Sequence, residues 1–481
     1  MWKHRGLQLH LRRSYTAATA TATSIATATT TAAQPPRAVR GMTDRFGASA
    51  TTHAHILSQA QQLLTRHNYQ PIHTPILEYS STFERTLGTS SDVVGKELYK
   101  FLDSSQQWMT MRPEGTAGIA RAALSNRMEM PQRLYYSGPM FRHERPQKGR
   151  LRQFEQFGVE ILGVAHPAAD VECVEIAWEL INGLGVGGVQ LKVNTLGDAQ
   201  SREAWRAALC QYFEQYRGDL SEDSLRRLVT NPLRILDSKD EKDMVVARGA
   251  PAYSSYLSAA SLRHFDFVQN GLQSLHIPYV LDPKLVRGLD YYQHTVWEVT
   301  CNSELLGRSQ ATVLAGGRYD GLSRALGSTK SMPGIGWAAG MERLTLLIRP
   351  DLISCPPVPV PILLVPERSG EGGGQRSVDD ALYAFAMRVA REVRRVVDDG
   401  AYVVHAPVSD TTETKPNEVG RKHPALGKQL ALLLGAEKNK VPGKIVIVGT
   451  AEMECNSVIV RDTASQTQLT VGLDSIRSAL K

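Results

Sequence analysis

The chain has 481 residues, a formal net charge of +7 and 42% hydrophobic residues. This length predicts about three domains, and the hydrophobic content is enough for packed cores, which excludes wholesale disorder. No apolar run approaches the ~18 residues of a membrane-spanning helix, so we expect no membrane partner. The five cysteines, at positions 173, 210, 301, 355 and 455, lie far apart, which excludes the usual cysteine zinc site and a disulfide framework. The positive charge permits a polyanionic partner.

The first 36 residues have the composition of a targeting segment. No Asp or Glu precedes Asp44, and most residues from Ser14 to Ala33 are Ser, Thr or Ala. Basic, acid-free sequence of this kind is typical of a transit peptide and lacks the apolar stretch of a secretory signal. We predict a disordered transit peptide at residues 1–36 and a location in the mitochondrial matrix. A plastid, a second cytoplasmic form that starts at Met42 and a low-complexity tail without an address remain alternatives.

The first folded domain is predicted to begin at residue 37. Apolar residues at helical spacing predict a helix over 51–67, which the prolines that follow end. Apolar and aromatic residues predict strands over Leu134–Phe141 and Phe154–Leu162. The charged stretch Arg142–Arg152 between them predicts a hairpin with a long exposed loop.

Beyond residue 198 the pattern changes. Charged residues alternate with apolar ones at helical spacing, which predicts a mainly helical insertion over about 199–275. Strand patterns return at 291–300 and 310–314, and a helix pattern begins at Glu342. Five prolines between residues 350 and 361 predict a linker at 351–360, so this first domain spans 37–350.

Residues 361–481 alternate between strand and helix patterns, which predicts a small α/β domain. The expected elements are strands at 362–365, 402–405, 444–448 and 457–461, helices at 379–397, 426–434 and the C-terminus, and a polar loop at 408–422.

Phosphate binding is the chemistry that the hairpin loop indicates. The planar guanidinium of arginine donates two parallel charged hydrogen bonds to a phosphate. Arg142 directly follows a strand, where it is held rigidly, and is the candidate for a nucleotide phosphate. Cations farther along the loop, from Arg145 to Arg152, are candidates for a nucleic-acid backbone. A solvated charged hairpin is the alternative interpretation.

Two further segments carry groups suited to a polar ligand. In Arg112–Thr116, the carboxylate of Glu114 beside Gly115 and a threonine suits an ammonium group, although a helix start explains the segment equally well. In Leu285–Tyr292, an arginine and paired tyrosines suit one pocket, because phenol groups fix polar ligands while their rings pack around them. A core strand entrance is the alternative.

The glycine-rich stretches 316–321 and 334–340 allow close approach of the backbone to a ligand, and Arg343 follows them near a helix start. No P-loop is present, and no Gly-x-Gly-x-x-Gly pattern leads from a strand into a helix. The sequence therefore lacks the motifs that usually indicate a kinase, a GTPase or a Rossmann oxidoreductase.

In this order, the segments resemble the class II aminoacyl-tRNA synthetases. The first helix and strand up to Pro75 resemble motif 1, Phe141–Gly163 resembles motif 2 and Gly334–Leu344 resembles motif 3. Leu285–Tyr292 and Ala315–Leu322 resemble the two signatures of the histidyl-tRNA synthetase family, of the bacterial and organellar type. The resemblance implies an α/β (α+β) fold: an antiparallel-sheet catalytic domain with a helical insertion, and a C-terminal anticodon-binding domain at 361–481.

The resemblance also implies a role for each matching residue. Arg142 and Arg287 would be catalytic, with Arg287 against the α-phosphate of ATP. The implied histidine-binding residues are Glu114, Gly115, Thr116, Gln156, Glu160, Arg287, Tyr291 and Tyr292. The implied ATP-binding residues are Arg142, Glu144 and Arg343, and those that face the acceptor end of the tRNA are Arg145 and Gln147. Mg²⁺ would accompany ATP as part of the substrate, with no permanently bound cofactor and no metal held by Cys or His.

The implied activity is ATP-dependent ligation of L-histidine to tRNA(His) through a histidyl-adenylate, with release of AMP and diphosphate, by a homodimer. The alternative is an inactive paralogue that serves as a regulatory subunit or a tRNA sensor. Such paralogues usually lose the catalytic arginine segment or the anticodon domain, and this chain keeps both. A basic RNA-binding protein would explain the charge but not the two histidine signatures. Two positions depart from the family pattern: Glu155 stands where a His is more familiar, and Trp337 is bulky enough to be expected to reshape the adenine pocket.

Overall fold

The computed structural model describes residues 36–480 except 89–90, 92, 148, 237, 287–288, 290, 307–311, 354–357, 366–379, 399, 405–425 and 435–440. The predicted transit peptide up to residue 35, the polar loop at 408–422 and Arg287 therefore lie outside the described residues. In the part of the chain that is described, no helix is long and apolar enough to cross a membrane.

A mixed eight-stranded sheet forms the centre of the first folded unit. Its strands, in spatial order, are β1 (Gln70–Pro71), β5 (Gln132–Phe141), β6 (Gln153–Leu162), β11 (Gly334–Gly340), β10 (Thr312–Arg318), β9 (Gln293–Cys301), β7 (Val189–Thr195) and β8 (Val280–Leu281). All neighbours are antiparallel except the two edge pairs, β1 with β5 and β7 with β8. This antiparallel-dominant sheet confirms the predicted fold class.

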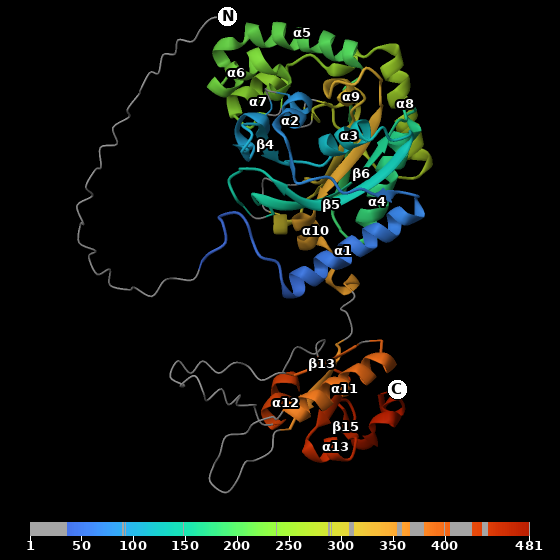
Figure 1. Ribbon diagram of the computed structural model, residues 1–481. Helices are drawn as coiled ribbons and strands as arrows, with labels where there is room; N and C mark the ends of the chain where they lie inside the picture. Colours follow the sequence, from blue (N-terminus) through green and yellow to red (C-terminus); the bar gives the residue numbers. More distant parts are fainter. Residues whose placement is uncertain are drawn as a thin grey trace, which may run out of the picture.

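Helices cover both faces of this sheet because its strands carry apolar side chains on both sides. One core contains Val159 of β6, Trp297 of β9 and apolar residues of the helices on that face, which are α1 (Gly47–Arg66), α4 (Ala168–Gly183), α8 (Ala259–Ser274) and α10 (Met341–Leu347). The other core lies under α2 (Ser80–Leu87), α3 (Thr116–Ser125) and α9 (Leu322–Ala325). Figure 1 shows α1 and α10 on one side of β5 and β6, with α3 and α9 on the other.

A small three-stranded sheet accompanies the second face. Its order is β2 (Leu77–Tyr79), β4 (Trp108–Met111) and β3 (Lys100–Leu102), and a π-helix at Val93–Glu97 precedes β3.

The segment predicted as a helical insertion, about 199–275, contains α5 (Ala199–Gln215), α6 (Glu222–Thr230), α7 (Glu241–Arg248) and α8. Their boundaries follow from side chains that accept backbone N–H groups at each helix start, because those groups have no partner inside the helix. The capping residues are Asp198, Ser221, Asp240 and Ser258. Trp205 and Phe213 centre a separate small core.

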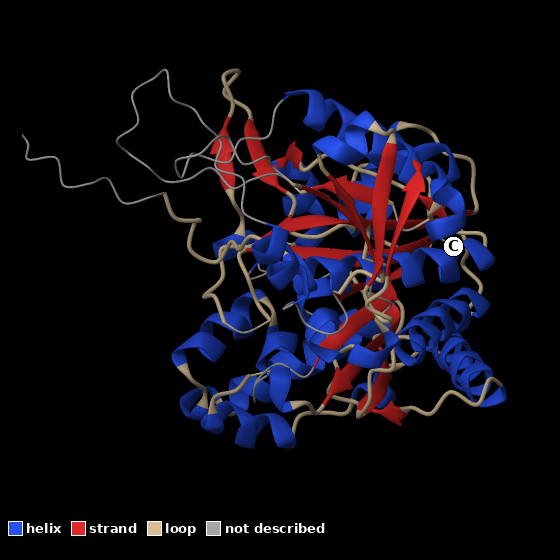
Figure 2. Cartoon of the chain, turned by 90° about the horizontal axis from the view of Figure 1, so that it is seen from below, coloured by secondary structure: helices blue, strands red, loops and turns tan. Residues whose placement is uncertain are grey.

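The C-terminal unit has a mixed five-stranded sheet of its own. The strand order is β13 (Ala401–Val403), β12 (Val360–Leu364), β14 (Lys444–Val448), β15 (Ser457–Asp462) and β16 (Gln468–Gly472). The first three are parallel and the last two pairings are antiparallel. The helices are α11 (Asp380–Val396), α12 (Leu426–Leu434), α13 (Thr450–Glu454) and α14 (Ile476–Leu480). Figure 2 shows the helices of the chain in blue and its strands in red.

Candidate active site

One pocket collects most of the residues singled out from the sequence. It lies on the α3 face of the large sheet and holds about 940 Å³ of empty volume that opens to solvent. The predicted site residues that line it are Glu114, Thr116, Arg142, Glu144, Gln156, Tyr291, Tyr292 and Arg343. They come from segments up to 229 residues apart in the chain, so the fold alone brings them together.

At one end of the pocket, Glu114 is held by the first turn of α3. Its two carboxylate oxygens accept the backbone N–H groups of Thr116 and Ala117, each at 2.8 Å. The hydroxyl of Tyr291 donates to the same carboxylate at 3.4 Å. Burial raises the pKa of Glu114, and the two backbone hydrogen bonds oppose this shift. The arrangement presents a fixed acceptor for a cationic group.

In the described part of the chain, two buried polar atoms in the same pocket as Glu114 lack hydrogen-bond partners that a ligand could supply. The side-chain oxygen Oε1 of Gln156 and the hydroxyl of Tyr136 have no hydrogen-bond partner among the described residues. Both residues line the pocket. A buried polar atom without a partner costs free energy, so a bound polar ligand would recover it. Gly115 permits this packing because a Cβ there would lie 2.3 Å from the Tyr136 ring.

Glu160 lies beneath this end of the pocket and is fully buried. It accepts a hydrogen bond from the hydroxyl of Thr116 at 2.7 Å and another from the hydroxyl of Tyr319. Burial raises the pKa of Glu160 to about 8, although both hydroxyls favour the charged form. The family resemblance implied a direct contact of Glu160 with the substrate, but Glu160 is not among the residues that line the pocket.

Tyr319 is a residue that our sequence analysis did not include in the site. It lies in the signature Ala315–Leu322, and that position was the available signal. Its ring is buried next to that of Tyr291, with centroids 5.7 Å apart. The ring of Tyr291 in turn packs on Tyr292 at 4.6 Å. Tyr291 and Tyr292 therefore line the deep end of the pocket, and Tyr319 packs against Tyr291 without lining it.

The other end of the pocket is rich in arginine. Arg142 donates from Nε to the carbonyl oxygen of Pro113 at 2.9 Å and packs 5.2 Å from the Phe154 ring centroid. Arg343, in the first turn of α10, donates from Nε to the carbonyl oxygen of Gly149 at 3.4 Å and from Nη1 to that of Thr312. Burial and the nearby arginines lower the pKa of Arg343. Mutually repelling, partly desolvated guanidinium groups are a suitable setting for a polyanion.

Glu144 stands between these cations. Its carboxylate pairs with Arg150 and lies 4.0 Å from Nη1 of Arg142. This carboxylate balances part of the positive charge.

The comparisons with known proteins agree with this geometry. Residues 41–344 match the family described as Histidyl-tRNA synthetase. A similar protein is the histidine--tRNA ligase of Rhodospirillum rubrum, which is 43% identical over 438 residues, or 90% of this chain and 96% of that protein.

The chain belongs to the histidyl-tRNA synthetase family.

Solved structures extend the likeness. The apo histidyl-tRNA synthetase of S. aureus superimposes with a TM-score of 0.68 at 27% identity and covers 93% of this chain and 100% of that chain. A Bacillus halodurans protein described as an ATP phosphoribosyltransferase regulatory subunit/histidyl-tRNA synthetase reaches a TM-score of 0.52 at 23% identity, over 79% of this chain and 94% of that chain. That second likeness shows the fold alone.

The bulky tryptophan that departs from the pattern of the histidyl-tRNA synthetase family does not fill the pocket. Alternation along β11 directs Trp337 to the face opposite Gly336 and Ala338. Its indole is buried in the core beside α1 and α4, where its ring centroid lies 5.9 Å from that of Phe157. Trp337 is among the residues that line the pocket, but the packing of its indole in this core does not support the expectation that the indole reshapes the adenine pocket.

In this member of the histidyl-tRNA synthetase family, the residues expected to face the tRNA lie on the exposed hairpin loop. Arg145 and Gln147 are both exposed. The loop closes through paired backbone hydrogen bonds between Gln147 and Arg150. Lys148, at its tip, is outside the described residues.

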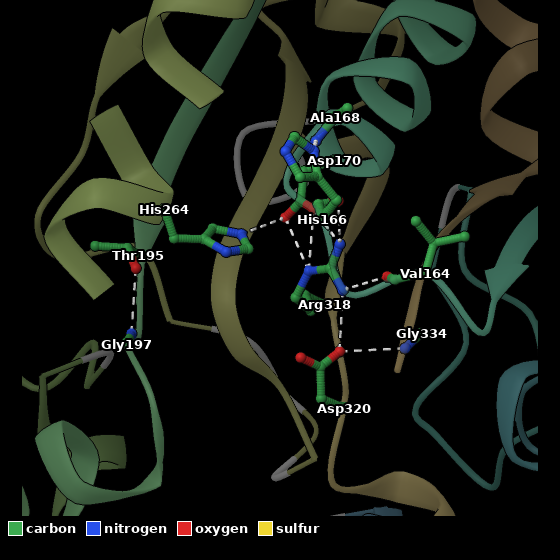
Figure 3. A network of polar contacts seen from close by, with 10 residues as sticks. All are labelled: Val164, His166, Ala168, Asp170, Thr195, Gly197, His264, Arg318, Asp320 and Gly334. Carbon is green, nitrogen blue, oxygen red and sulfur yellow. Dashed lines mark hydrogen bonds and ion pairs between the residues drawn. The ribbon is translucent and has the colours of Figure 1, made fainter. Parts of the chain in front are cut away.

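A buried ion-pair network supports the end of the strand that precedes Tyr319 in this synthetase fold. Arg318, at the end of β10, is fully buried and donates from Nε to Asp170 of α4 at 3.0 Å and from Nη1 to Asp320 at 3.1 Å. His264 of α8 lies 3.2 Å from Asp170 on its other side, and Figure 3 shows Arg318 and His264 both directed at that carboxylate, while Asp320 contacts Arg318. The network ties two helices to the floor of the pocket.

Proposed function

We propose that the chain catalyses the ATP-dependent ligation of L-histidine to tRNA(His), through a histidyl-adenylate and with release of diphosphate and AMP. The observation that carries this proposal is a single pocket with carboxylate and phenol groups at its deep end and arginines at the other. Membership of the histidyl-tRNA synthetase family and the 43% identity to a histidine--tRNA ligase support it.

Histidine is proposed to bind at the deep end. Glu114, Thr116 and Gln156 would hold its ammonium group, because a carboxylate, a hydroxyl and an amide oxygen all accept its hydrogen bonds. Glu160, through the hydroxyls that it orients, and Tyr292 would recognise the imidazole. Tyr291 would line the same cavity, and Gly115 would leave room for it.

Activation would proceed by attack of the histidine carboxylate on the α-phosphorus of ATP, which breaks the bond to diphosphate. No general base is required, because the carboxylate is already ionised. Negative charge develops on the phosphoryl oxygens, and a preorganised cation there lowers the barrier. Arg142 would supply this cation together with Arg287, whose part in the proposal rests on the sequence.

ATP is proposed to lie along the arginine end of the pocket. Arg343 would bind the γ-phosphate and Glu144 would lie near the adenine. Mg²⁺ would enter with the phosphates and neutralise part of their charge. Glu144 and Glu342 are the carboxylates at this end, and within the described ranges no group of three or more His, Cys, Asp or Glu could hold a metal ion by itself.

In the second step, a hydroxyl of the terminal ribose of the tRNA would attack the carbonyl carbon of the adenylate, with AMP as the leaving group. Arg145 and Gln147 on the exposed loop would guide the acceptor end. We assign residues 37–350 to the catalytic domain, with its insertion at about 199–275, and 351–360 to a linker. Residues 361–481 would bind the anticodon stem.

We also propose how the chain assembles and in which compartment of the cell it is located. A second copy would cover the exposed apolar side chains Leu77, Tyr79 and Phe101 on one face of the three-stranded sheet and form a homodimer. Residues 1–36, by their composition, would direct the chain to the mitochondrial matrix, with the plastid and a cytoplasmic form as alternatives.

The test is histidine-dependent exchange between ATP and labelled diphosphate, with protein that lacks residues 1–36. We expect exchange with histidine alone among the amino acids, and a loss of about 100-fold in Arg142→Ala and in Arg287→Ala. Arg66→Ala, a change at an exposed ion pair on α1, is the control and should keep full exchange. A folded protein without exchange would overturn the ligase proposal in favour of an inactive paralogue.

A further inference from the structure

The segment before α1 lies against the base of the hairpin loop that carries Arg142. The backbone oxygen of Gly41 accepts the N–H groups of Arg152 at 2.8 Å and Gln153 at 3.3 Å. Gly41 has φ +84°, and a Cβ there would lie 2.9 Å from side-chain carbons of both Pro146 and Arg152. The segment is therefore packed against both arms of the loop.

Arg45, four residues later, joins two carboxylates from distant parts of the chain. Its Nη1 lies 3.2 Å from Oε2 of Glu155 on β6, and its Nη2 lies 2.9 Å from Oε1 of Glu342 on α10. The same Glu342 carboxylate accepts the backbone N–H of Glu155 at 3.1 Å. His53 of α1 also contacts Glu155. The N-terminal end of α1, β6 and α10 are thus joined by contacts around the guanidinium group of Arg45.

Each of these carboxylates is next in sequence to a residue of the pocket. Glu155 precedes Gln156, and Glu342 precedes Arg343, which is the proposed ligand of the γ-phosphate. The side chain of Glu342 is only 14% exposed. Two carboxylates this close repel each other unless a cation lies between them. Arg45 is such a cation, and it adds to the direct hydrogen bonds from the Glu155 N–H to Glu342 that link α10 to β6.

We propose that Arg45 is a positioning residue of the ATP site: by bridging Glu155 and Glu342, it fixes α10 against β6 and thereby sets the position of Arg343. This inference rests on the proposed function, in which Arg343 binds ATP. It gives a role to a segment that precedes the first helix and does not touch the substrate. It also accounts for Glu155, the residue that departs from the family pattern, as one half of this bridge.

The experiment compares Arg45→Ala, Arg45→Lys and Arg66→Ala in diphosphate exchange. Arg66 is the control because, like Arg45, it forms an ion pair, in its case from α1 to Glu179, but it does not line the pocket or touch Glu155 or Glu342. In Arg45→Ala we expect the KM for ATP to rise about tenfold, which corresponds to about 1.4 kcal/mol, while the KM for histidine stays unchanged. Arg45→Lys should recover part of this loss, because it restores one cation but not the two-pronged contact.

The outcomes separate the two proposals. A wild-type protein without exchange overturns the proposed function itself. Exchange in the wild type together with an unchanged KM for ATP in Arg45→Ala, or an equal rise for ATP and histidine, overturns the positioning role alone. Urea denaturation shows whether each variant is folded. If Arg45→Ala is not, Arg45→Gln takes its place, and an unchanged KM for ATP in that folded variant also overturns the proposal.

Discussion

Glu160 is a buried acid whose proton should make stability depend on pH. Because its pKa in the folded chain is raised to about 8, the folded state keeps a proton that the unfolded chain has already lost above its ordinary pKa. Stability should therefore fall as the pH rises from about 5 to 8, by at most about 1.4 kcal/mol per pH unit. Glu160→Gln has no proton to lose and should show a flatter dependence in urea denaturation.

Glu155→Gln is the control for this prediction. The hydrogen bond with His53, together with Arg45, lowers the pKa of Glu155. Its contribution to stability is complete above the ordinary carboxyl pKa and is lost only as the pH falls through the lowered value. Between about pH 5 and pH 8 this variant should keep the wild-type slope. Equal slopes in wild type and Glu160→Gln would contradict the assignment of the proton to Glu160.

At the scale of one element, the carboxylate of Glu160 packs against β11 and leaves no room for a side chain at position 336. A Cβ at Gly336 would come within 1.8 Å of Oε2 of Glu160 and 2.4 Å of the Val159 carbonyl oxygen. Neither group can move away, because Glu160 is buried and Val159 belongs to the paired strand β6. We expect Gly336→Ala to lower the free energy of unfolding by about 2 kcal/mol and to weaken histidine binding, as measured by urea denaturation and calorimetry.

Gly340, at the end of the same strand, is the matched position. A Cβ there meets only the side chain of Arg343, at 3.9 Å, which is an ordinary contact. Gly340→Ala should therefore change the free energy of unfolding by less than about 0.5 kcal/mol. If the two variants were equally unstable, loss of glycine from the strand, rather than the contact with Glu160, would explain the effect.

Elements with a strong periodic pattern were predicted well, and short ones were not. The helix predicted at 426–434 and the strand predicted at 444–448 have those same bounds in α12 and β14. Strands β3 and β8, with three and two residues, were missed. A strand this short carries too few residues for alternation to be visible and exists only because a neighbouring strand pairs with it.

At the scale of the whole molecule, the two folded units have separate hydrophobic cores. We therefore expect that histidine activation can be separated from the charging of tRNA. Phe385 and Val446 of the C-terminal unit belong to a core that shares no residue with those around the large sheet. A chain ending at residue 353 should therefore retain most of its histidine-dependent exchange. Its charging of tRNA(His) should fall at least about tenfold, because the proposed anticodon contacts would supply binding to the tRNA alone.

This comparison requires two measurements on the same protein. Filter assays measure charging at varied tRNA concentration, and exchange assays measure histidine activation. A shortened chain that loses exchange and charging together, while still folded, would contradict the separation of the two steps. Full charging by the shortened chain would contradict the anticodon-binding role of residues 361–481.

The sequence by itself determined the chemistry available to this protein and the order of its parts. Arg142 was recognisable because a rigid strand end and a charged loop are adjacent in the chain, and Glu114 because its carboxylate stands beside Gly115 and a threonine. Only the tertiary structure decided which residues support them. Glu160 meets Tyr319 across 159 residues, and Arg45 meets Glu342 across 297. Local patterns report on neighbours within a few residues, whereas such contacts exist only after strands and helices have packed.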